Sequence, residues 1–189
     1  MIIKTDKPTA VFLLEADRDY LIARLINFAG AAFASRSGYF SQQALEKYLK
    51  AFSVQEAQEY LKTHDLLELA KHCSKFHKDL SNKKFIENLK IFNAFIDLGR
   101  YGGEASHDPY SKKTKNVETA SIILWQASNI KILDLLVFTI RSKLDFERIR
   151  FDDSLKSIQK KNKKSYFVKT WKLPIKLRDI LIIENNYFN

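Results

Sequence analysis

Arg100 and His107 have the residue types and the spacing that phosphoryl chemistry uses. They form an Arg-x6-His pattern in a glycine-containing stretch. A guanidinium stabilises negative charge on a phosphorus atom under attack, and an imidazole takes or gives a proton near pH 7. RNA carries its own nucleophile, the 2′-hydroxyl, so such a pair can act without a metal ion. The pattern therefore points to metal-independent cleavage of RNA as the chemistry to consider.

A lysine-rich tract supplies the second group of candidate residues. Positions 154–178 hold nine Lys and Arg residues and no acidic one, whereas the rest of the chain, whose total net charge is +10, is nearly balanced. Lysines neutralise phosphates, and interleaved aromatic residues can stack on unpaired bases. The candidate RNA-binding residues are Lys160, Lys161, Lys163, Lys164, Lys169 and Lys172. Alternatively, Phe167 and Trp171 dock the tract onto the protein while its lysines stay solvated; both roles are compatible.

Four residues of metal-binding type, His64, His72, Cys73 and His77, do not have the spacing of a metal site. Zinc requires four converging nitrogen or sulfur ligands. His64 and His72 would lie more than two helical turns apart, and the neighbouring His72 and Cys73 diverge. The sequence also has no phosphate-binding glycine loop and no dinucleotide-binding pattern. We therefore expect no metal and no cofactor.

Charged residues near the N-terminus have a simpler interpretation. Asp17 with Arg24, and Asp19 with Arg18, are expected to form exposed ion pairs of small energetic value. Asp65 is expected to stabilise the start of a helix, where a negative charge is favourable.

Helical periodicity runs through most of the chain and predicts the elements that would position these residues. The expected helices cover about 9–36, 39–52 with a continuation to 61, 64–80, 83–99 and 116–144. Ser35–Gly38 is taken as the stop of the first helix, and Thr63 as the N-cap of the third. Short connections between such helices predict an all-α fold, an up-and-down bundle of four to five helices with a basic C-terminal extension.

Composition agrees with a single globular domain. Of 189 residues, 46% are apolar and 29% charged, and only 5 Gly and 3 Pro occur, which disfavours an all-β fold. We expect the bundle over 9–144 and the basic extension, packed on or beside it, over 145–189. We expect no membrane span and no signal peptide. The single cysteine, Cys73, is consistent with a reducing, cytoplasmic location.

Three segments in order carry a resemblance to a known family. They are the helix FSQQALEKYLKAF at 40–52, THDLLEL at 63–69, and Arg-Tyr-Gly at 100–102. Together they resemble the HEPN family (higher eukaryote and prokaryote nucleotide-binding), over about 13–140. The resemblance implies a compact helical bundle that forms a homodimer and cuts RNA without metal. Arg100 would stabilise the phosphate and transition state, and His107 would be the general base or acid. It also implies a toxin partnered by a small nucleotidyltransferase-like antitoxin.

Ala105 departs from the toxin pattern, in which a tyrosine stands two positions before the histidine and is modified by the antitoxin. This departure keeps an alternative open: a non-catalytic helical module that binds RNA or nucleotide, or that docks a nucleotidyltransferase partner. A third alternative is a purely structural dimer whose basic tail serves solubility.

Overall fold

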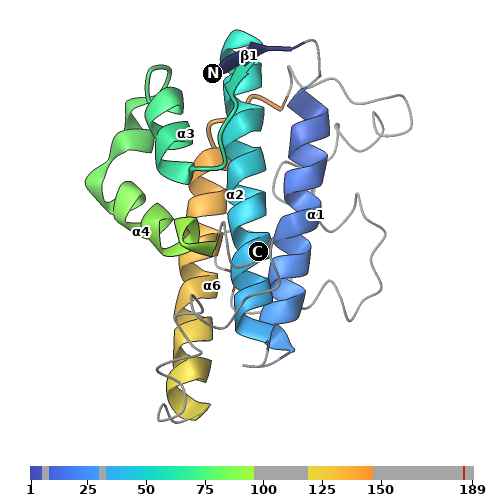
Figure 1. Cartoon of the computed structure of the whole chain (residues 1–189), viewed down its shortest axis with the longest axis vertical. Coiled ribbons are helices and arrows are strands. Elements are labelled where there is room, and N and C mark those ends of the chain that lie inside the picture. Colours follow the sequence, from blue (N-terminus) through green and yellow to red (C-terminus); the bar gives the residue numbers. More distant parts are fainter. Residues whose placement is uncertain (6–8, 30–32, 96–118, 147–184, 186–189) are drawn as a thin grey trace.

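The computed structural model describes residues 1–5, 9–29, 33–95, 119–146 and 185. Five α-helices occur within these residues (Figure 1). They are α1 (Thr9–Phe28), α2 (Ala34–Ala57), α3 (Leu66–Cys73), α4 (Lys83–Asn93) and α6 (Thr119–Arg141). The prediction of a helical bundle is therefore confirmed.

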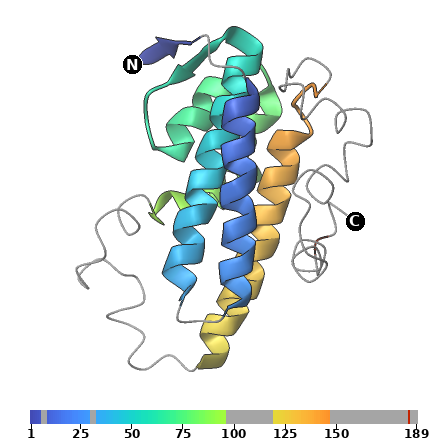
Figure 2. The same ribbon diagram turned by 90° about the vertical axis from the view of Figure 1, so that its right-hand side faces the viewer.

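The three long helices, α1, α2 and α6, lie side by side and form the body of the bundle (Figure 2). The shorter α3 and α4 cover α2 on the side away from α1, and α4 also contacts α6 (Figure 1). α1 ends, α2 begins and α6 begins at one end of the bundle, which we call the turn end. α2 and α6 therefore run in the same direction, and α1 runs opposite to both.

The core is formed where these helices meet. α1 contributes Leu13 and Tyr20, and α2 contributes Leu45, Tyr48 and Leu49, all fully buried. The remaining buried apolar side chains include Leu66, Leu69, Leu89, Phe92, Leu133, Leu136, Val137 and Ile140. The second half of α6 lies in this core. None of the described helices has the length and apolar character needed to cross a membrane.

A short antiparallel ribbon, which the sequence did not predict, lies at the other end of the bundle (Figure 1). It joins β1 (Ile2–Lys4) to β2 (Glu59–Leu61), with Ile3 opposite Tyr60. The expected continuation of the second helix to residue 61 is wrong because α2 ends at Gln58, which adopts a left-handed conformation with φ of 53°. The Gln58 N–H donates to Val54 at 2.9 Å, and the chain then leaves the helix in an extended conformation.

The expected stop at Ser35–Gly38 is also wrong, because these residues lie inside α2. α1 already ends at Phe28. Gly38 serves close packing instead: a Cβ atom there would lie 2.4 Å from the ring of Phe95. The glycine therefore lets the end of the α4 region approach the first turns of α2.

Asp65, and not Thr63, is the N-cap of α3. Its carboxylate accepts hydrogen bonds from the N–H groups of Leu67 (2.7 Å) and Glu68 (3.1 Å), as an N-cap does. α3 is shorter than the expected 64–80 and stops at Cys73. A single 3-10 turn, η2 (Lys78–Ser81), then places Leu80 in the core.

Candidate functional site

The residues that the sequence proposes for catalysis and RNA binding lie outside the described residues. Arg100 and His107 fall within 96–118, and the six candidate lysines fall within 147–184. The described residues therefore give the frame to which both segments are attached.

The 96–118 segment connects two helices, and the residue before it is well packed. Phe95, the last described residue before it, is buried against Gly38 of α2. The first residue after the segment, Thr119, begins α6. Both α4 and α6 contact α2 and each other. The segment that carries Arg100 and His107 therefore connects two helices of the same bundle.

Polar contacts also hold the two ends of the 147–184 segment. The side-chain amide of Gln55 donates to the carbonyl of Asp145 and accepts from its N–H, both at 2.8 Å. At the other end, Asn185 is buried and its side-chain N–H group donates to the Tyr20 hydroxyl at 2.9 Å. The residues that flank the 147–184 segment on both sides therefore contact the bundle.

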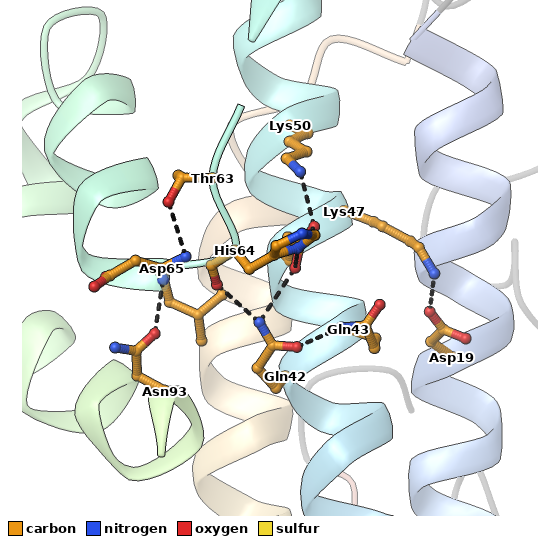
Figure 3. A network of polar contacts seen from close by, with 11 residues as sticks. Asp19, Gln42, Gln43, Lys47, Lys50, Thr63, His64, Asp65 and Asn93 are labelled. Carbon is orange, nitrogen blue, oxygen red and sulfur yellow. Dashed lines mark hydrogen bonds and ion pairs between the residues drawn. The ribbon is translucent and has the colours of Figure 1, made fainter. Parts of the chain in front are cut away.

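A polar network centred on Glu46 joins two of the segments that carry the family resemblance (Figure 3). His64 Nδ1 lies 3.1 Å from both carboxylate oxygens of Glu46. Lys50 Nζ donates to the same carboxylate at 2.8 Å. The side chain of Gln42 donates to the backbone carbonyl of His64 at 2.9 Å, which fixes the turn before α3 against α2.

Electrostatics keep this carboxylate ionised. Burial alone would raise the pKa of Glu46, but the hydrogen bonds and positive charges of Lys50 and His64 outweigh burial and lower it. Glu46 contacts the half-exposed imidazole of His64, and Lys50 pairs with the same carboxylate. Glu46 therefore helps to hold the 63–65 turn against α2.

The same turn is tied to α4. The N–H of Leu66 donates to Oδ1 of Asn93 at 2.8 Å (Figure 3). Asn93 is the last residue of α4 and lies two positions before Phe95. The network around Glu46 is therefore connected, through one hydrogen bond, to the point where the 96–118 segment leaves the bundle.

Two buried ion pairs join α1 to α6, and they overturn the expectation of exposed pairs at Asp17 and Arg24. Arg24 pairs with Asp134, and Arg141 pairs with Asp17 at 2.6 Å, all four side chains being almost completely buried. Arg18 does not pair with Asp19 but with Glu15, on the exposed face of α1. For Asp17 and Arg24 the expectation failed because it matched charges along one helix, whereas their partners lie on α6.

Each buried pair has further hydrogen-bond partners. The Tyr48 hydroxyl donates to Asp17 at 2.6 Å, and the Tyr20 hydroxyl donates to Asp134 at 2.5 Å. Burial raises the pKa of both carboxyl groups, and the paired arginines act in the opposite direction. These contacts satisfy charges that would otherwise be costly to bury.

The sequence does contain a signal for these pairs. Asp17 and Arg24 are seven residues apart on α1, and Asp134 and Arg141 are seven apart on α6. Seven residues are close to two helical turns, so each couple lies on one face. Because the two helices run in opposite directions, each aspartate meets the arginine of the other helix.

The residues of metal-binding type have separate partners. His64 contacts Glu46, His72 lies 3.8 Å from Glu59, and His77 lies 3.6 Å from Asp79. Cys73 is buried, and burial raises the pKa of its thiol to about 12. Within the part of the chain that the structure describes, no three histidine, cysteine or acidic residues are grouped as metal ligands would be.

Comparison with known proteins gives one match. The model of the HEPN domain family matches residues 11–130, which is more than half of the chain. The matched range includes α1 to α4, the 96–118 segment and the first half of α6. No curated protein and no solved structure matches the chain.

Proposed function

The chain belongs to the HEPN domain family, which includes ribonucleases, and on that premise we propose that it is a metal-independent, toxin-like endoribonuclease. The active unit is a homodimer in whose cleft Arg100 and His107 act on RNA. The observation that supports this assignment best is the match to the HEPN domain over 11–130, a range that contains both Arg100 and His107.

The reaction uses the 2′-hydroxyl of the substrate as the nucleophile. Its oxygen forms a new bond to phosphorus, the bond from phosphorus to the 5′-oxygen breaks, and the products are a 2′,3′-cyclic phosphate and a 5′-hydroxyl. Arg100 stabilises the negative charge that develops on the phosphoryl oxygens. His107 takes the proton of the attacking hydroxyl or gives one to the leaving oxygen. Two copies of the motif in one cleft provide one imidazole for each transfer.

The lysine-rich tract holds the RNA. Lys160, Lys161, Lys163, Lys164, Lys169 and Lys172 neutralise backbone phosphates, which makes binding depend steeply on salt. The contacts of Asp145 with Gln55 and of Asn185 with Tyr20 support this role, because they hold the residues that flank the segment containing the tract against the bundle. A nucleotidyltransferase-like antitoxin is the protein partner that we propose.

Arg100→Ala and His107→Ala test the catalytic roles. We expect each to lower RNA cleavage at least a hundredfold, with an unchanged circular-dichroism spectrum and loss of growth inhibition in cells. Cleavage by the parent should continue in EDTA and yield cyclic-phosphate ends. His77→Ala is the control, since His77 is a partly exposed histidine outside the 96–118 segment. If both variants cut RNA as well as the parent, the assigned roles are wrong.

The tract is better tested by substitution than by truncation. Removing the chain after Leu144 would also remove Phe146, which lies 5.1 Å from the Arg141 guanidinium, and the buried Asn185. Replacing the six lysines by glutamine keeps both residues in place. We expect weaker RNA binding and a shallower dependence on salt, by about one unit of slope for each phosphate that is no longer neutralised. Unchanged binding would favour a tail that serves only solubility.

Ala105 favours a second candidate, a non-catalytic module that binds RNA or nucleotide or docks a nucleotidyltransferase. Under this alternative, purified protein binds RNA with steep salt dependence but yields no cyclic-phosphate product. The assay of the parent protein alone therefore separates the two candidates.

A further inference from the structure

Large apolar side chains are unusually exposed at the turn end of the bundle. Phe28 at the end of α1 is 43% exposed, and Phe33, directly before α2, is 49% exposed. Together with neighbouring residues they line a pocket of about 660 Å³. The lining residues are Leu25, Ile26, Phe28, Ala29, Phe33, Arg36 and Phe40. An apolar concavity of this volume is large enough to hold a small planar group.

The lining of the pocket suits a ligand that has a flat, apolar part and a negative charge. Three phenyl rings contribute to its wall, its volume is in the range of small-ligand pockets, and among the described residues no acidic side chain lines it. Arg36 is the charged residue of this lining. Its positive charge favours an anion.

The pocket lies at the end of the bundle where the proposed catalytic segment is attached. Arg36 and Phe40 are in the first two turns of α2, on either side of Gly38, against which Phe95 is packed. Phe95 precedes Arg100 by five residues. The 96–118 segment, which carries Arg100, therefore follows a residue, Phe95, that packs at the same end of the bundle as the pocket.

We propose that this pocket binds one unpaired base of the substrate RNA, with the adjoining phosphate on Arg36. The inference rests on the proposed ribonuclease function and adds to it a specificity: the enzyme needs a single-stranded nucleotide next to the cut. Aromatic side chains bind unpaired bases by stacking, and bases inside a duplex are not available for it.

Phe33→Ala is the direct test, because the side chain is half exposed and its removal leaves the core intact. Binding is measured by fluorescence anisotropy with a short, fluorescein-labelled single-stranded RNA, in the full-length protein carrying His107→Ala so that the RNA stays uncut. We expect the dissociation constant to rise about tenfold, the loss typical of one stacked base. Phe33→Trp should bind as the parent does, and Arg36→Gln should lower the salt slope by about one.

Two controls make the result specific. Phe76→Ala removes a phenyl ring of similar exposure, 40%, between α3 and η2, and it should leave binding unchanged. Duplex RNA should bind Phe33→Ala and the parent alike. If Phe33→Ala and the parent bind single-stranded RNA with equal affinity, the inference about the pocket is wrong, and the proposed function is unaffected. A parent that binds no RNA would overturn both.

A second copy of this chain is the competing occupant of the pocket. Sedimentation velocity of Phe33→Ala without RNA distinguishes it. An unchanged oligomeric state together with weaker RNA binding supports the base pocket. Conversion to monomer shows instead that the phenyl rings form a protein interface, and it overturns the inference.

Discussion

Arg24→Met is predicted to be the most damaging single change on α1 outside the apolar core. Arg24 is completely buried and pairs with Asp134, whose carboxylate also accepts the hydrogen bond of Tyr20. Methionine fills much of the same space without a charge. The variant therefore leaves a carboxylate that is only 2% exposed and has no counterion.

The expected cost follows from that uncompensated charge. Removing one partner of a buried ion pair typically lowers the free energy of unfolding by about 3–5 kcal/mol. This is a large share of the roughly 5–15 kcal/mol by which domains are stable. The exposed pair on the same helix provides the comparison: Arg18 and Glu15 are 52% and 46% exposed. Arg18→Met should therefore cost about 1 kcal/mol or less.

Urea unfolding followed by far-ultraviolet circular dichroism measures both losses of stability. The double variant Arg24→Met, Asp134→Leu then tests whether the unpaired carboxylate is the cause of the loss in Arg24→Met. Removing both charges avoids the unpaired carboxylate, so the double variant should recover much of the lost stability. If Arg24→Met does not fold, a folded double variant would still show that the unpaired carboxylate is the cause. A cost for Arg24→Met as small as that for Arg18→Met would refute the reasoning, as would a double variant less stable than the single one.

Three further predictions concern other buried positions. Gly38→Ala should destabilise the protein by about 1–3 kcal/mol in urea unfolding, because its methyl group would meet the Phe95 ring; a gain, as in an open helix, would contradict this. Burial and the charge of Lys75 lower the pKa of His72. The free energy of unfolding should therefore decrease as the pH falls from about 6.5 through the lowered pKa of the folded state. His72→Gln should flatten that dependence, and an equally steep curve would exclude His72 as its source. Cys73, with a pKa of about 12, should resist iodoacetamide in the folded protein and react on unfolding, as mass spectrometry of the single cysteine will show; rapid native labelling would argue against its burial.

Local sequence patterns were sufficient to predict the helices. Apolar residues at helical spacing located α1, α2, α4 and α6, and the apolar residues Phe85, Leu89 and Phe92 of α4 are buried. They were less informative about where helices end. Gly38 looked like a stop, and only the contact with Phe95 shows why a glycine is needed inside a helix.

Partners far apart in the sequence could not be predicted in the same way. Arg24 and Asp134 are separated by 110 residues, and Asp17 and Arg141 by 124. Their burial depends on how α6 docks, which no local pattern encodes. Gln58 is similar, since its left-handed conformation serves a ribbon whose other strand is at the N-terminus. Of the candidate site, Arg100, His107 and the lysines stay predictions from the sequence.

The reciprocal ion pairs between α1 and α6 have a consequence for how the chain assembles. In a chain whose α1 and α2 have paired while α6 is still undocked, Asp17 and Arg24 would face water, and this face of the hairpin would be hydrated. The same two charges, seven residues apart, are also complementary to a second α1 laid antiparallel. Two such hairpins that meet before α6 docks could therefore pair with each other through these charges. Renaturation at high protein concentration should accordingly divert molecules into such dimers, and dilution should restore the yield of the native bundle.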